Sequence, residues 1–487
     1  MPPIDRAPPA DAVGPWRPGA AADYARGWST FWDLGWTRAG GARTVDAARS
    51  ARLTGLVRHA RAHSAFYREA YAALPDDPPL TTLPVVTKRA LMARFDDWVA
   101  DPALRRRDVD AFLADRAHVG ERFLDRYIVW KSSGSTGEPG IYLQDDDALA
   151  VYDALVAAQL LSMPLARRCA EGLIAGGRAA LVIATGDHFA SIASWERARR
   201  AAPGLAAHSF SVMTPLPELV AALNSYAPAF VASYPTMLAL LAAERAAGRL
   251  RVAPSLVWSG GEFLAPGARD ALAAAFGCPV LNEYGTSECM SIASSCERGW
   301  LHVNADWVIV EPVDADYRAV APGATSNSVL LTNLANRVQP ILRYDLGDAV
   351  VARPDPCPCG SPLPAIRVEG RREDVLVLPG AHGRDVRVPP MALTTVVEDA
   401  ADLARFQIAQ ISAQALVLRV GAEDARKADR AALQRALAAL RDYLTRVGVA
   451  GVQVAADNAA PRVDPRSGKL RQVVIELAPS APPNRAR

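Results

Sequence analysis

Residues 230–284 read FVASYPTMLALLAAERAAGRLRVAPSLVWSGGEFLAPGARDALAAAFGCPVLNEY. Short apolar runs that end in small or polar residues alternate here with helical stretches, and the same pattern begins upstream. The apolar runs are 181–185, 230–234, 255–259 and 279–284. The helical stretches between them include 217–226, 235–248 and 266–276. This alternation predicts a mostly parallel sheet covered by helices. Because ligands of such sheets bind beyond the carboxyl ends of the strands, we expect a site near the ends of these runs, at Thr185, Tyr234, Ser259 and Tyr284.

The sequence on the carboxyl side of this alternation changes character twice. Residues 302–351 are β-rich with little helix, and beyond about residue 370 a strand pair (405–420), a long helix (424–447) and a strand (450–455) fit a small separate domain. We therefore predict an α/β protein. Its large N-terminal domain, 1–372, has mostly parallel, helix-covered sheets and a β-rich subdomain, and its small C-terminal α+β domain is 373–487.

The amino-terminal region begins with a Pro-, Ala- and Gly-rich arm, residues 1–22. Trp28, Trp32 and Trp36 then recur at i, i+4 and i+8, which places them on one face of a helix that we expect to dock on the main body. Apolar residues between Leu53 and Tyr67 mark a second amphipathic helix.

Composition narrows the class of protein. The 487 residues carry a net charge of +2, and half are hydrophobic, which argues against a nucleic-acid partner. No run of 18 apolar residues occurs, so we expect no membrane partner. The N-terminus lacks the apolar stretch of a secretory signal, and six cysteines do not make a disulfide framework in so long a chain. We therefore expect a cytoplasmic protein whose cysteines are thiols or metal ligands.

Residues 131–140, KSSGSTGEPG, form a glycine-rich loop. Glycine lets the backbone approach a ligand closely, and hydroxyl and backbone N–H groups together can cradle phosphate oxygens. No Gly-Lys-Ser/Thr follows, so this is not a Walker loop. Taken alone, the stretch also fits a flexible linker. The candidate phosphate ligands are Ser132, Ser133, Gly134, Ser135, Thr136 and Gly137.

This loop resembles the phosphate-binding loop of the adenylate-forming superfamily, which includes acyl-CoA synthetases, adenylation domains and firefly luciferases. Further stretches resemble other motifs of that superfamily, in the same order along the chain. They are SGGE (259–262), NEYGTSE (282–288), RYDLGD (343–348), GRRED (370–374), and PR (461–462) with SGKLR (467–471). Residues 51–91 also resemble the N-terminal segment of the phenylacetate–CoA ligase branch.

The resemblance implies ATP- and magnesium-dependent formation of an acyl-adenylate. Tyr284 is then expected to lie against the adenine, Asp348 to bind the ribose hydroxyls and Ser287 to contact the α-phosphate. Glu288 is expected to hold Mg²⁺, a role that suits a carboxylate. Gly260, Gly261, Glu262, Glu283 and Gly285 complete the expected nucleotide site. In isolation, Asp348 also fits a turn aspartate and Glu288 a solvated carboxylate at a helix start.

The carboxyl-terminal motifs imply a mobile domain. Lys469 is expected to stabilise the charge that develops between the carboxylate and the α-phosphate, although an exposed lysine in a polar tail is the plainer interpretation of that residue alone. Arg371 is expected to support the ribose and phosphate side, and Glu373 stands at the hinge position of the family.

Family position also implies an acyl pocket. Its expected lining residues are His188, Phe189, Ser233, Tyr234 and Trp258, which would suit an aryl or arylacetic acid but are equally compatible with plain core. One stretch departs from the family: PGAHGRDVRVPP (379–390) stands where relatives usually have a short Gly-Asn turn, near the face that serves thiol transfer.

A separate set of residues has the chemistry of a metal site. Cys296 and His302 form one pair and Cys357 and Cys359 another, which gives four ligands suited to a closed, structural zinc site. The spacing between the pairs is not a standard finger spacing, and ordinary thiols beside a surface histidine are the alternative.

Three functions remain open. The leading one is an acid–CoA ligase that acts on a small carboxylic acid with ATP, Mg²⁺ and coenzyme A. The second adenylates an acid and passes it to an amine or a carrier-protein thiol. The third is a non-catalytic nucleotide-binding homologue, against which the retention of Lys469 and Glu288 argues. Assembly as a homodimer also stays open.

Overall fold

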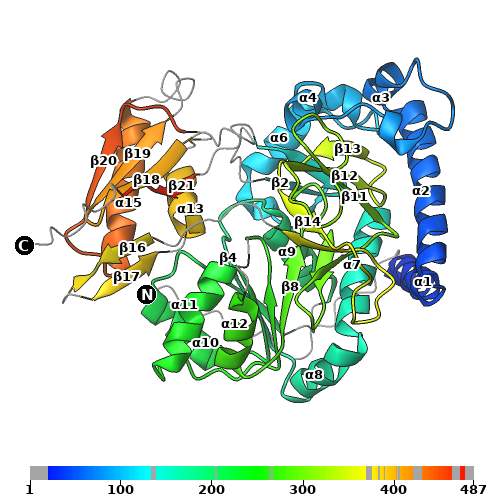
Figure 1. Ribbon diagram of the computed structural model, residues 1–487. Helices are drawn as coiled ribbons and strands as arrows, with labels where there is room; N and C mark the ends of the chain where they lie inside the picture. Colours follow the sequence, from blue (N-terminus) through cyan, green and yellow to red (C-terminus); the bar gives the residue numbers. More distant parts are fainter. Residues whose placement is uncertain are drawn as a thin grey trace, which may run out of the picture.

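The computed structural model describes residues 20–132, 139–202, 204, 206–262, 264, 267–368, 376–381, 384–388, 390–401, 403, 406–420, 430–462 and 472–477. A large body built around a nine-stranded sheet lies beside a smaller group of C-terminal elements (Figure 1). The α/β class predicted from the sequence is confirmed.

The central sheet is parallel on one side and antiparallel on the other. In spatial order its strands are β14 (Val350–Ala352), β15 (Ala365–Val368), β10 (Leu301–Val303), β9 (Ala293–Ser295), β8 (Val280–Tyr284), β7 (Leu256–Ser259), β6 (Phe230–Ser233), β4 (Ala179–Ile183) and β5 (Ala207–Ser211). Strands β8, β7, β6, β4 and β5 run parallel, and the pairings from β8 to β14 are antiparallel. Strands β10 and β14, at the two ends of the predicted β-rich region, therefore belong to the same sheet as the parallel strands.

Helices connect and cover the parallel strands, as the sequence predicted. They are α7 (Asp146–Leu160), α8 (Met163–Ile174), α9 (Ala190–Ala201), α10 (Leu216–Tyr226), α11 (Pro235–Ala246) and α12 (Ala268–Phe276). Proline at the first or second position of α10 and α11 suits a helix start, where its missing N–H has no intrahelical partner. Buried Val257 and Leu238 belong to one apolar cluster that joins the sheet to these helices.

Two small antiparallel sheets lie beside the central sheet. One contains β1 (Arg122–Phe123), β2 (Tyr127–Lys131) and β3 (Ile141–Gln144), and the other β11 (Val308–Val313), β12 (Ser328–Asn333) and β13 (Ile341–Asp345). Both contribute to an apolar core that also includes fully buried Trp98, Trp130 and Tyr142. This core fixes the strands that flank the glycine-rich loop and the RYDLGD motif.

The C-terminal elements form a second structural group. A four-stranded sheet has the order β20 (Gln453–Asp457), β19 (Ala415–Val420), β18 (Phe406–Ser412) and β21 (Val473–Ile475), and it packs with α13 (Pro390–Ala401) and α15 (Arg430–Arg446). The hairpin of β16 (Leu376–Pro379) and β17 (Asp385–Val388) precedes them. The expected strand pair and long helix are found, whereas the boundary at 372/373 falls outside the described residues and stays a prediction.

The C-terminal group touches the body close to the carboxyl end of β4. Arg116 Nη2 lies 2.9 Å from Asp399 Oδ1 of α13, and a Cβ on Gly186 would come within 2.9 Å of Asp399 Oδ2. Burial raises the pKa of Asp399, with the Arg116 charge opposing that shift. The orientation seen here therefore places an acidic side chain of α13 against the loop that follows β4.

The amino-terminal helices differ from expectation in two ways. They are α1 (Ala20–Ala39), α2 (Ala42–His63), α3 (Ala65–Ala70), α4 (Lys88–Ala93), α5 (Phe95–Trp98), α6 (Arg106–Ala114) and the 3₁₀ turns η1 (Leu80–Thr82) and η2 (Arg116–His118). The expected helix over 53–67 is broken at Ser64, whose backbone is extended and whose hydroxyl caps α3 by accepting from Tyr67 N. The helix α1 docks on the body as expected, but through its buried Leu34 and Thr37, whereas the face that carries Trp28, Trp32 and Trp36 points to solvent.

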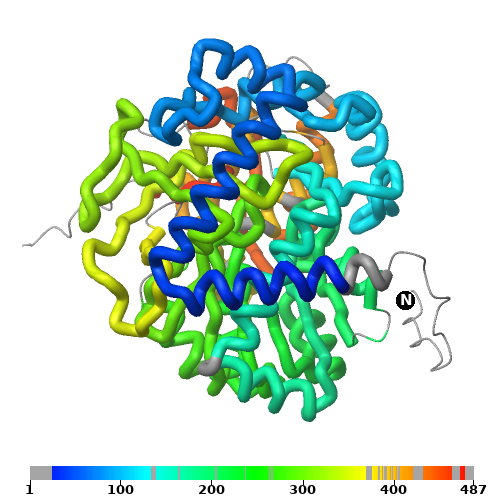
Figure 2. Tube along the Cα trace, turned by 90° about the vertical axis from the view of Figure 1, so that its right-hand side faces the viewer, coloured from blue at the N-terminus to red at the C-terminus, as the bar shows by residue number. Residues whose placement is uncertain are grey.

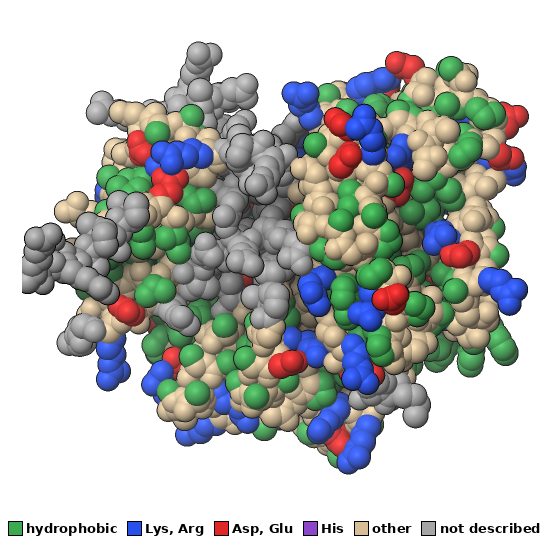
Figure 3. Space-filling model, viewed as in Figure 1, with side chains coloured by type: hydrophobic (Ala, Val, Ile, Leu, Met, Phe, Trp, Pro, Cys, Tyr) green, Lys and Arg blue, Asp and Glu red, His purple; other side chains and the backbone are tan. Residues whose placement is uncertain are grey.

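Among the described residues, no single helix has the length and apolar character needed to cross a membrane, and the bent pair Asp146–Leu160 and Leu165–Ile174 passes only as a pair, by length and composition. Basic and acidic side chains are interspersed over the face seen in Figure 3.

Candidate functional site

The clearest contact in the candidate site joins Tyr284 to Asp348. Tyr284 is the last residue of β8, and Asp348 follows β13 by three residues. The tyrosine hydroxyl donates to Asp348 Oδ2 over 2.9 Å, and Asp348 is only 8% exposed. Two motifs that the sequence assigned to the adenine and the ribose therefore meet at the carboxyl edge of the sheet.

A tight turn carries the chain from Tyr284 to Glu288. A Cβ on Gly285 would lie 1.9 Å from the Met290 carbonyl oxygen, so only glycine fits this close backbone approach. Thr286 and Cys289 close the turn through N–H···O bonds of 2.9 and 3.2 Å. Trp130 Nε1 donates to the Ser287 carbonyl over 2.8 Å, which ties the turn to β2. The backbone packing of this turn thus explains why residue 285 is glycine, independently of nucleotide binding.

Two tyrosine hydroxyls hold the carboxylate of Glu288. Tyr142 and Tyr344 each donate to Glu288 Oε1 over 2.8 Å. Burial raises the pKa of both tyrosines well above the usual value, with the Glu288 charge adding to the shift, so both hydroxyls stay protonated donors. Asn333 Nδ2 donates to the Glu288 carbonyl over 3.0 Å. The solvated-carboxylate alternative is wrong, because Glu288 is only 9% exposed.

The sequence reasoning missed Tyr142, Trp130 and Asn333. Tyr142 lies in the short strand directly after the glycine-rich loop, and Trp130 lies in the strand directly before it. Both strands are buried along almost their whole length, so burial does not single these residues out, and their partners at 287–288 are set by tertiary packing. The resemblance could have found them only through an alignment that covers these strands.

The SGGE segment follows β7 and lies against β8. Gly261 has φ of +80°, and a Cβ there would come within 3.0 Å of the Tyr234 ring, so this position needs glycine. Gly260 N donates to the Ser233 carbonyl over 3.2 Å. A Cβ on Gly260 would lie 3.5 Å from the Glu283 carbonyl. Gly260 and Gly261 therefore lie between Tyr234 and β8, as a site at the strand ends requires, and Glu262 follows them directly.

Buried polar atoms at the ends of these strands have no hydrogen-bond partner within the described structure. They are Ser259 Oγ and Asn282 Oδ1, which belong to residues paired across β7 and β8, and His188 Nδ1. Such atoms are costly to leave unsatisfied, so they are groups that a polar ligand can engage. Only His188 was among the residues predicted to line the acyl pocket.

Glu283 points into the protein rather than toward Tyr284 and Asp348. Its Oε1 accepts from Ser291 Oγ over 2.6 Å, and Ser291 Oγ in turn accepts from Asn304 Nδ2 over 3.2 Å. Arg38 Nη2 donates to Asn304 Oδ1 over 2.9 Å, so the chain of donors reaches back to α1. Burial raises the pKa of Glu283 to about 7, against the opposing hydrogen bonds from Ser291 and Trp258.

Ser132 and Gly140 fasten the base of the glycine-rich loop. Ser132 N donates to the Gly140 carbonyl and Gly140 N donates to Ser132 Oγ, both over 2.8 Å. Lys131 Nζ pairs with Asp187 Oδ2 at 2.5 Å, which links the loop to the end of β4. The other predicted phosphate ligands, Ser133, Gly134, Ser135, Thr136 and Gly137, lie outside the described residues.

The five predicted pocket residues do not share one environment. His188 is buried, its Nε2 lies 3.0 Å from the Asp115 carbonyl oxygen, and burial lowers its pKa, so the ring is neutral and Nδ1 is an acceptor. Phe189, Ser233 and Tyr234 are buried near the ends of β4 and β6, with Ser233 Oγ donating to the Val182 carbonyl. Trp258 packs against a cluster with Leu165 and Leu281. Their joint role as an acyl pocket stays a prediction.

Three residues with expected roles in the chemistry or the hinge fall outside the described residues: Lys469, Arg371 and Glu373. Their expected roles stay predictions. The neighbouring Arg462 is described, and its backbone N–H donates to Gln407 Oε1 over 3.1 Å, which attaches this end of the segment to β18.

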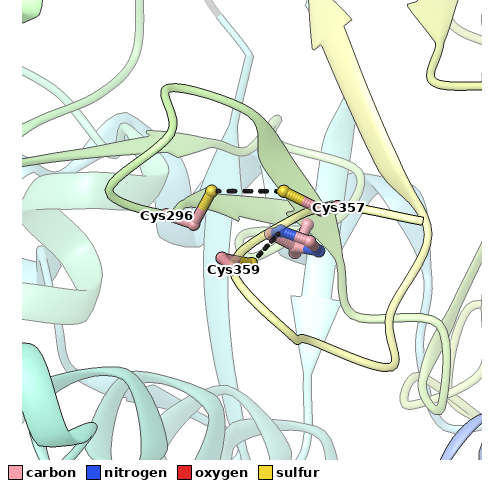
Figure 4. Close-up of side chains that lie close together, drawn as sticks. Cys296, Cys357 and Cys359 are labelled. Atoms are coloured by element: carbon pink, nitrogen blue, oxygen red, sulfur yellow. Dashed lines mark hydrogen bonds between the residues drawn. The ribbon is translucent and has the colours of Figure 1, made fainter. Parts of the chain in front are cut away.

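The two cysteine-containing pairs meet in space, as the sequence predicted (Figure 4). One ligand atom from each of Cys296, His302, Cys357 and Cys359 lies within 4.8 Å of all the others. The Cys296 and Cys357 sulfurs are 3.9 Å apart, and Cys359 Sγ lies 3.2 Å from His302 Nε2. Tetrahedral bonds of zinc to sulfur and nitrogen imply separations of about 3.8 Å and 3.5 Å, so the four residues fit this ion.

The tautomer and charge of His302 suit metal binding. His302 Nδ1 lies 2.9 Å from the Leu363 carbonyl oxygen, which fixes the proton on Nδ1 and leaves Nε2 as the ligand atom. Burial lowers the pKa of His302, which favours the neutral ring. All six cysteines of the chain are free thiols in the structure.

Comparison with solved structures identifies the fold. The chain matches a 2-hydroxyisobutyryl-CoA ligase bound to its acyl-adenylate and coenzyme A in the thioester-forming state, with a TM-score of 0.52, 22% identity, and coverage of 89% of this chain and 90% of that one. An open conformation of the same ligase gives a TM-score of 0.50, 20% identity, and coverage of 89% and 92%. The chain has the fold of the adenylate-forming acid–CoA ligases. The resemblance inferred from the sequence motifs is thus confirmed at the level of this ligase fold.

Among curated proteins, phenylacetate-coenzyme A ligase of Thermus thermophilus is 24% identical over 277 residues, which are 54% of this chain. The match spans 59% of the length of that ligase. No family model matches the chain. This relative is of the kind that the sequence motifs resemble, namely the phenylacetate–CoA ligase branch.

Proposed function

We propose that this protein activates a carboxylic acid with ATP and Mg²⁺, releases pyrophosphate, and transfers the acyl group from the acyl-adenylate to coenzyme A. The observation that carries the proposal is the contact between Tyr284 and Asp348. It joins an aromatic ring and a buried carboxylate from separate motifs at the sheet edge where ligands bind.

The chain's own groups have separate tasks in this reaction. The Tyr284 ring supports the adenine, and Asp348 accepts hydrogen bonds from the ribose hydroxyls. Glu288 is the carboxylate for Mg²⁺, which neutralises phosphate charge when bound. Both tyrosine bonds go to one oxygen of Glu288, so they orient the carboxylate without engaging its second oxygen. Ser287, which directly precedes Glu288, is proposed to contact the α-phosphate of ATP.

Bond changes in the proposed reaction balance without a further reactant. A carboxylate oxygen of the acid bonds to the α-phosphorus of ATP, and the bond to pyrophosphate breaks. The thiolate of coenzyme A then bonds to the acyl carbon, and AMP leaves with the oxygen that came from the acid. Lys469, Arg371 and the loop at 132–137 are proposed to stabilise charge in the first step, and Glu373 to act as the hinge between the two.

The acid is proposed to be aryl or arylacetic. The buried aromatic side chains of Phe189 and Tyr234 follow β4 and β6, and the Tyr234 ring lies close to Gly261. Support also comes from the name of the curated relative, a phenylacetate-coenzyme A ligase. A cytoplasmic location is proposed on the six free thiols.

A second acceptor is favoured by one feature. The β16–β17 hairpin stands where the family has a short turn, and it pairs with the rest of the C-terminal group through the Gly380–Val449 bridge. Because this hairpin changes the surface that would meet the acyl acceptor, an amine or a carrier-protein thiol could be the nucleophile in place of coenzyme A. The first half-reaction is the same for both acceptors.

The cysteine cluster is proposed to hold one structural zinc ion. Four protein ligands leave no open position, so the ion would fasten the loop at 296–302 to the loop at 357–359 and take no part in catalysis.

Pyrophosphate release over a panel of carboxylic acids tests the proposed function. We expect release that depends on ATP, Mg²⁺ and one class of acid, with acyl-CoA detected by mass when coenzyme A is added. Acyl-AMP that persists with coenzyme A but disappears with an amine or a carrier protein would favour the second acceptor. No release with any acid would support the nucleotide-binding homologue.

A further inference from the structure

The outer face of α1 carries three exposed tryptophans, which we call the tryptophan face: Trp28, Trp32 and Trp36. Their side chains are 58%, 57% and 74% exposed. Figure 2 shows α1 crossing the outside of the body with no described segment in front of it. Scattered exposed apolar residues are ordinary, but three tryptophans in register on one helix form a contiguous patch, and such patches mark interaction sites.

The opposite face of α1 is fixed to the body. Leu34 and Thr37 are buried there, and Arg38 pairs at 3.0 Å with Asp306, whose side chain is fully buried. Arg26 pairs at 2.7 Å with Asp147 of α7. Breaking a buried ion pair is strongly unfavourable, so α1 cannot rotate to bury its tryptophans against its own chain.

The tryptophan face is also ordered in advance. The Phe31 ring lies 5.9 Å from the Trp28 ring and 6.0 Å from the Trp32 ring, in edge-to-face contacts. Aromatic side chains held by such contacts lose little entropy when a partner covers them. Gly35 lies between Trp32 and Trp36, and a Cβ there would meet nothing within 4 Å, which leaves room for a side chain of a partner.

The area of the face fits association with a second copy. With about 250 Å² for each tryptophan, the three exposed fractions amount to roughly 450 Å². A stable interface needs about 800 Å² from each partner, so the tryptophans alone supply more than half. The exposed residues that flank them on α1, Ser29 and Ala39 among them, can provide the remainder.

The charges around the face argue against a membrane. A helix that lies on anionic lipid presents Lys and Arg beside its apolar stripe. Here the neighbouring cations are engaged within the chain: Arg26 with Asp147, Arg38 with Asp306 and Arg52 with Asp33. Because these cations are paired with carboxylates, the apolar surface has no excess of positive or negative charge beside it. Two such surfaces can therefore face each other without charge repulsion.

We propose that two copies of this chain associate through the tryptophan face, with α1 antiparallel to α1 of the partner subunit about a twofold axis near Trp32. A twofold interface brings the same patch of both copies together, and an antiparallel arrangement places Trp28 beside Trp36 of the partner subunit. Bulky tryptophans then fill the space above the small residues of the facing helix. This association is independent of the proposed chemistry.

Sedimentation velocity of the full chain, over a wide range of protein concentration, tests this interface. We expect wild type to be a dimer of the 51.9-kDa chain. Trp32→Glu puts two carboxylates near the axis and should weaken association by at least about 100-fold, because tryptophans at the centre of an interface are typical hot spots. The matched control is Ile174→Glu on α8, whose side chain is 88% exposed, and it should leave association unchanged.

Circular dichroism melting checks that Trp32→Glu is folded, and Trp36→Ser provides a milder second variant that should also weaken the dimer. The interface is overturned if wild type is a monomer throughout, or if the folded Trp32 and Trp36 variants dimerise as wild type does. Monomeric wild type that sediments with phosphatidylserine vesicles would also overturn it, in favour of a lipid surface.

Discussion

Tyr284 donates a hydrogen bond of 2.9 Å to Asp348, although 64 residues separate them in the chain. The bond connects the end of a parallel strand to the turn that follows β13. The two side chains expected to contact the nucleoside are therefore positioned by the fold itself. Removing either partner should affect nucleotide binding before it affects chemistry.

We expect Asp348→Ala to raise KM for ATP by roughly 10- to 100-fold, because hydrogen bonds to a charged group contribute about 1.5–3 kcal/mol. Tyr284→Phe keeps the ring and should have a smaller effect. Steady-state pyrophosphate release measures both. Asp316→Ala removes an exposed carboxylate that pairs with Arg318, and it should match wild type. An Asp348 variant with an unchanged KM would contradict the ribose assignment.

Lys469→Ala should abolish adenylation while ATP binding is retained, because the lysine is expected to act mainly in the transition state. Loss of such a charged contact costs roughly 10²–10³-fold in kcat. Single-turnover pyrophosphate release and ATP titration calorimetry separate the two effects. Lys88→Ala at the start of α4 is the matched control. Activity within a few-fold of wild type would remove Lys469 from the mechanism.

Glu283 should make stability depend on pH. Its pKa is raised by burial to about 7, above the ordinary value near 4.5, so its contribution is full below about pH 4.5 and is lost as the pH rises through 7. The difference corresponds to roughly 3 kcal/mol. We expect the melting temperature of wild type, relative to Glu283→Gln, to fall between pH 5 and pH 8. A constant difference across that range would show that burial does not control this carboxyl.

Protein purified without added metal should contain about one zinc per chain by elemental analysis, on the four-ligand rule. Replacing Cys357 and Cys359 together by serine should remove the zinc and lower the melting temperature. Cys169→Ser changes a free thiol of α8 that is not in the cluster and should do neither. Wild-type protein that contains no zinc would contradict the proposed metal site.

Periodicity and alternation in the sequence predict much of the fold. Short apolar runs can be told from helical stretches by their length and periodicity, so 230–234 and 279–284 could be predicted as strands. Both belong to the parallel part of the central sheet. The four proposed zinc ligands were grouped correctly for a local reason, since Cys296 and His302 belong to the β9–β10 hairpin and Cys357 and Cys359 to one turn. The glycines at 261 and 285 were found through the motif, and the structure adds the close backbone approaches that require them.

What the sequence could not predict depends on contacts between distant residues. The spacing of Trp28, Trp32 and Trp36 shows that they share a face, but not which face turns inward. That choice is set by Arg38, whose partner Asp306 lies 268 residues away. Likewise, Tyr142 holds Glu288 across 146 residues. The break at Ser64 depends on a single cap that outweighs a continuous apolar pattern.

The central claim, that the acid's carboxylate attacks the α-phosphate of ATP, is tested most directly with ¹⁸O. The best acid from the panel, labelled in its carboxylate, is incubated with enzyme, ATP, Mg²⁺ and coenzyme A, and the products are weighed by mass spectrometry. The account predicts one ¹⁸O atom in AMP and none in pyrophosphate. Unlabelled AMP, or ADP with ¹⁸O in inorganic phosphate, would contradict it.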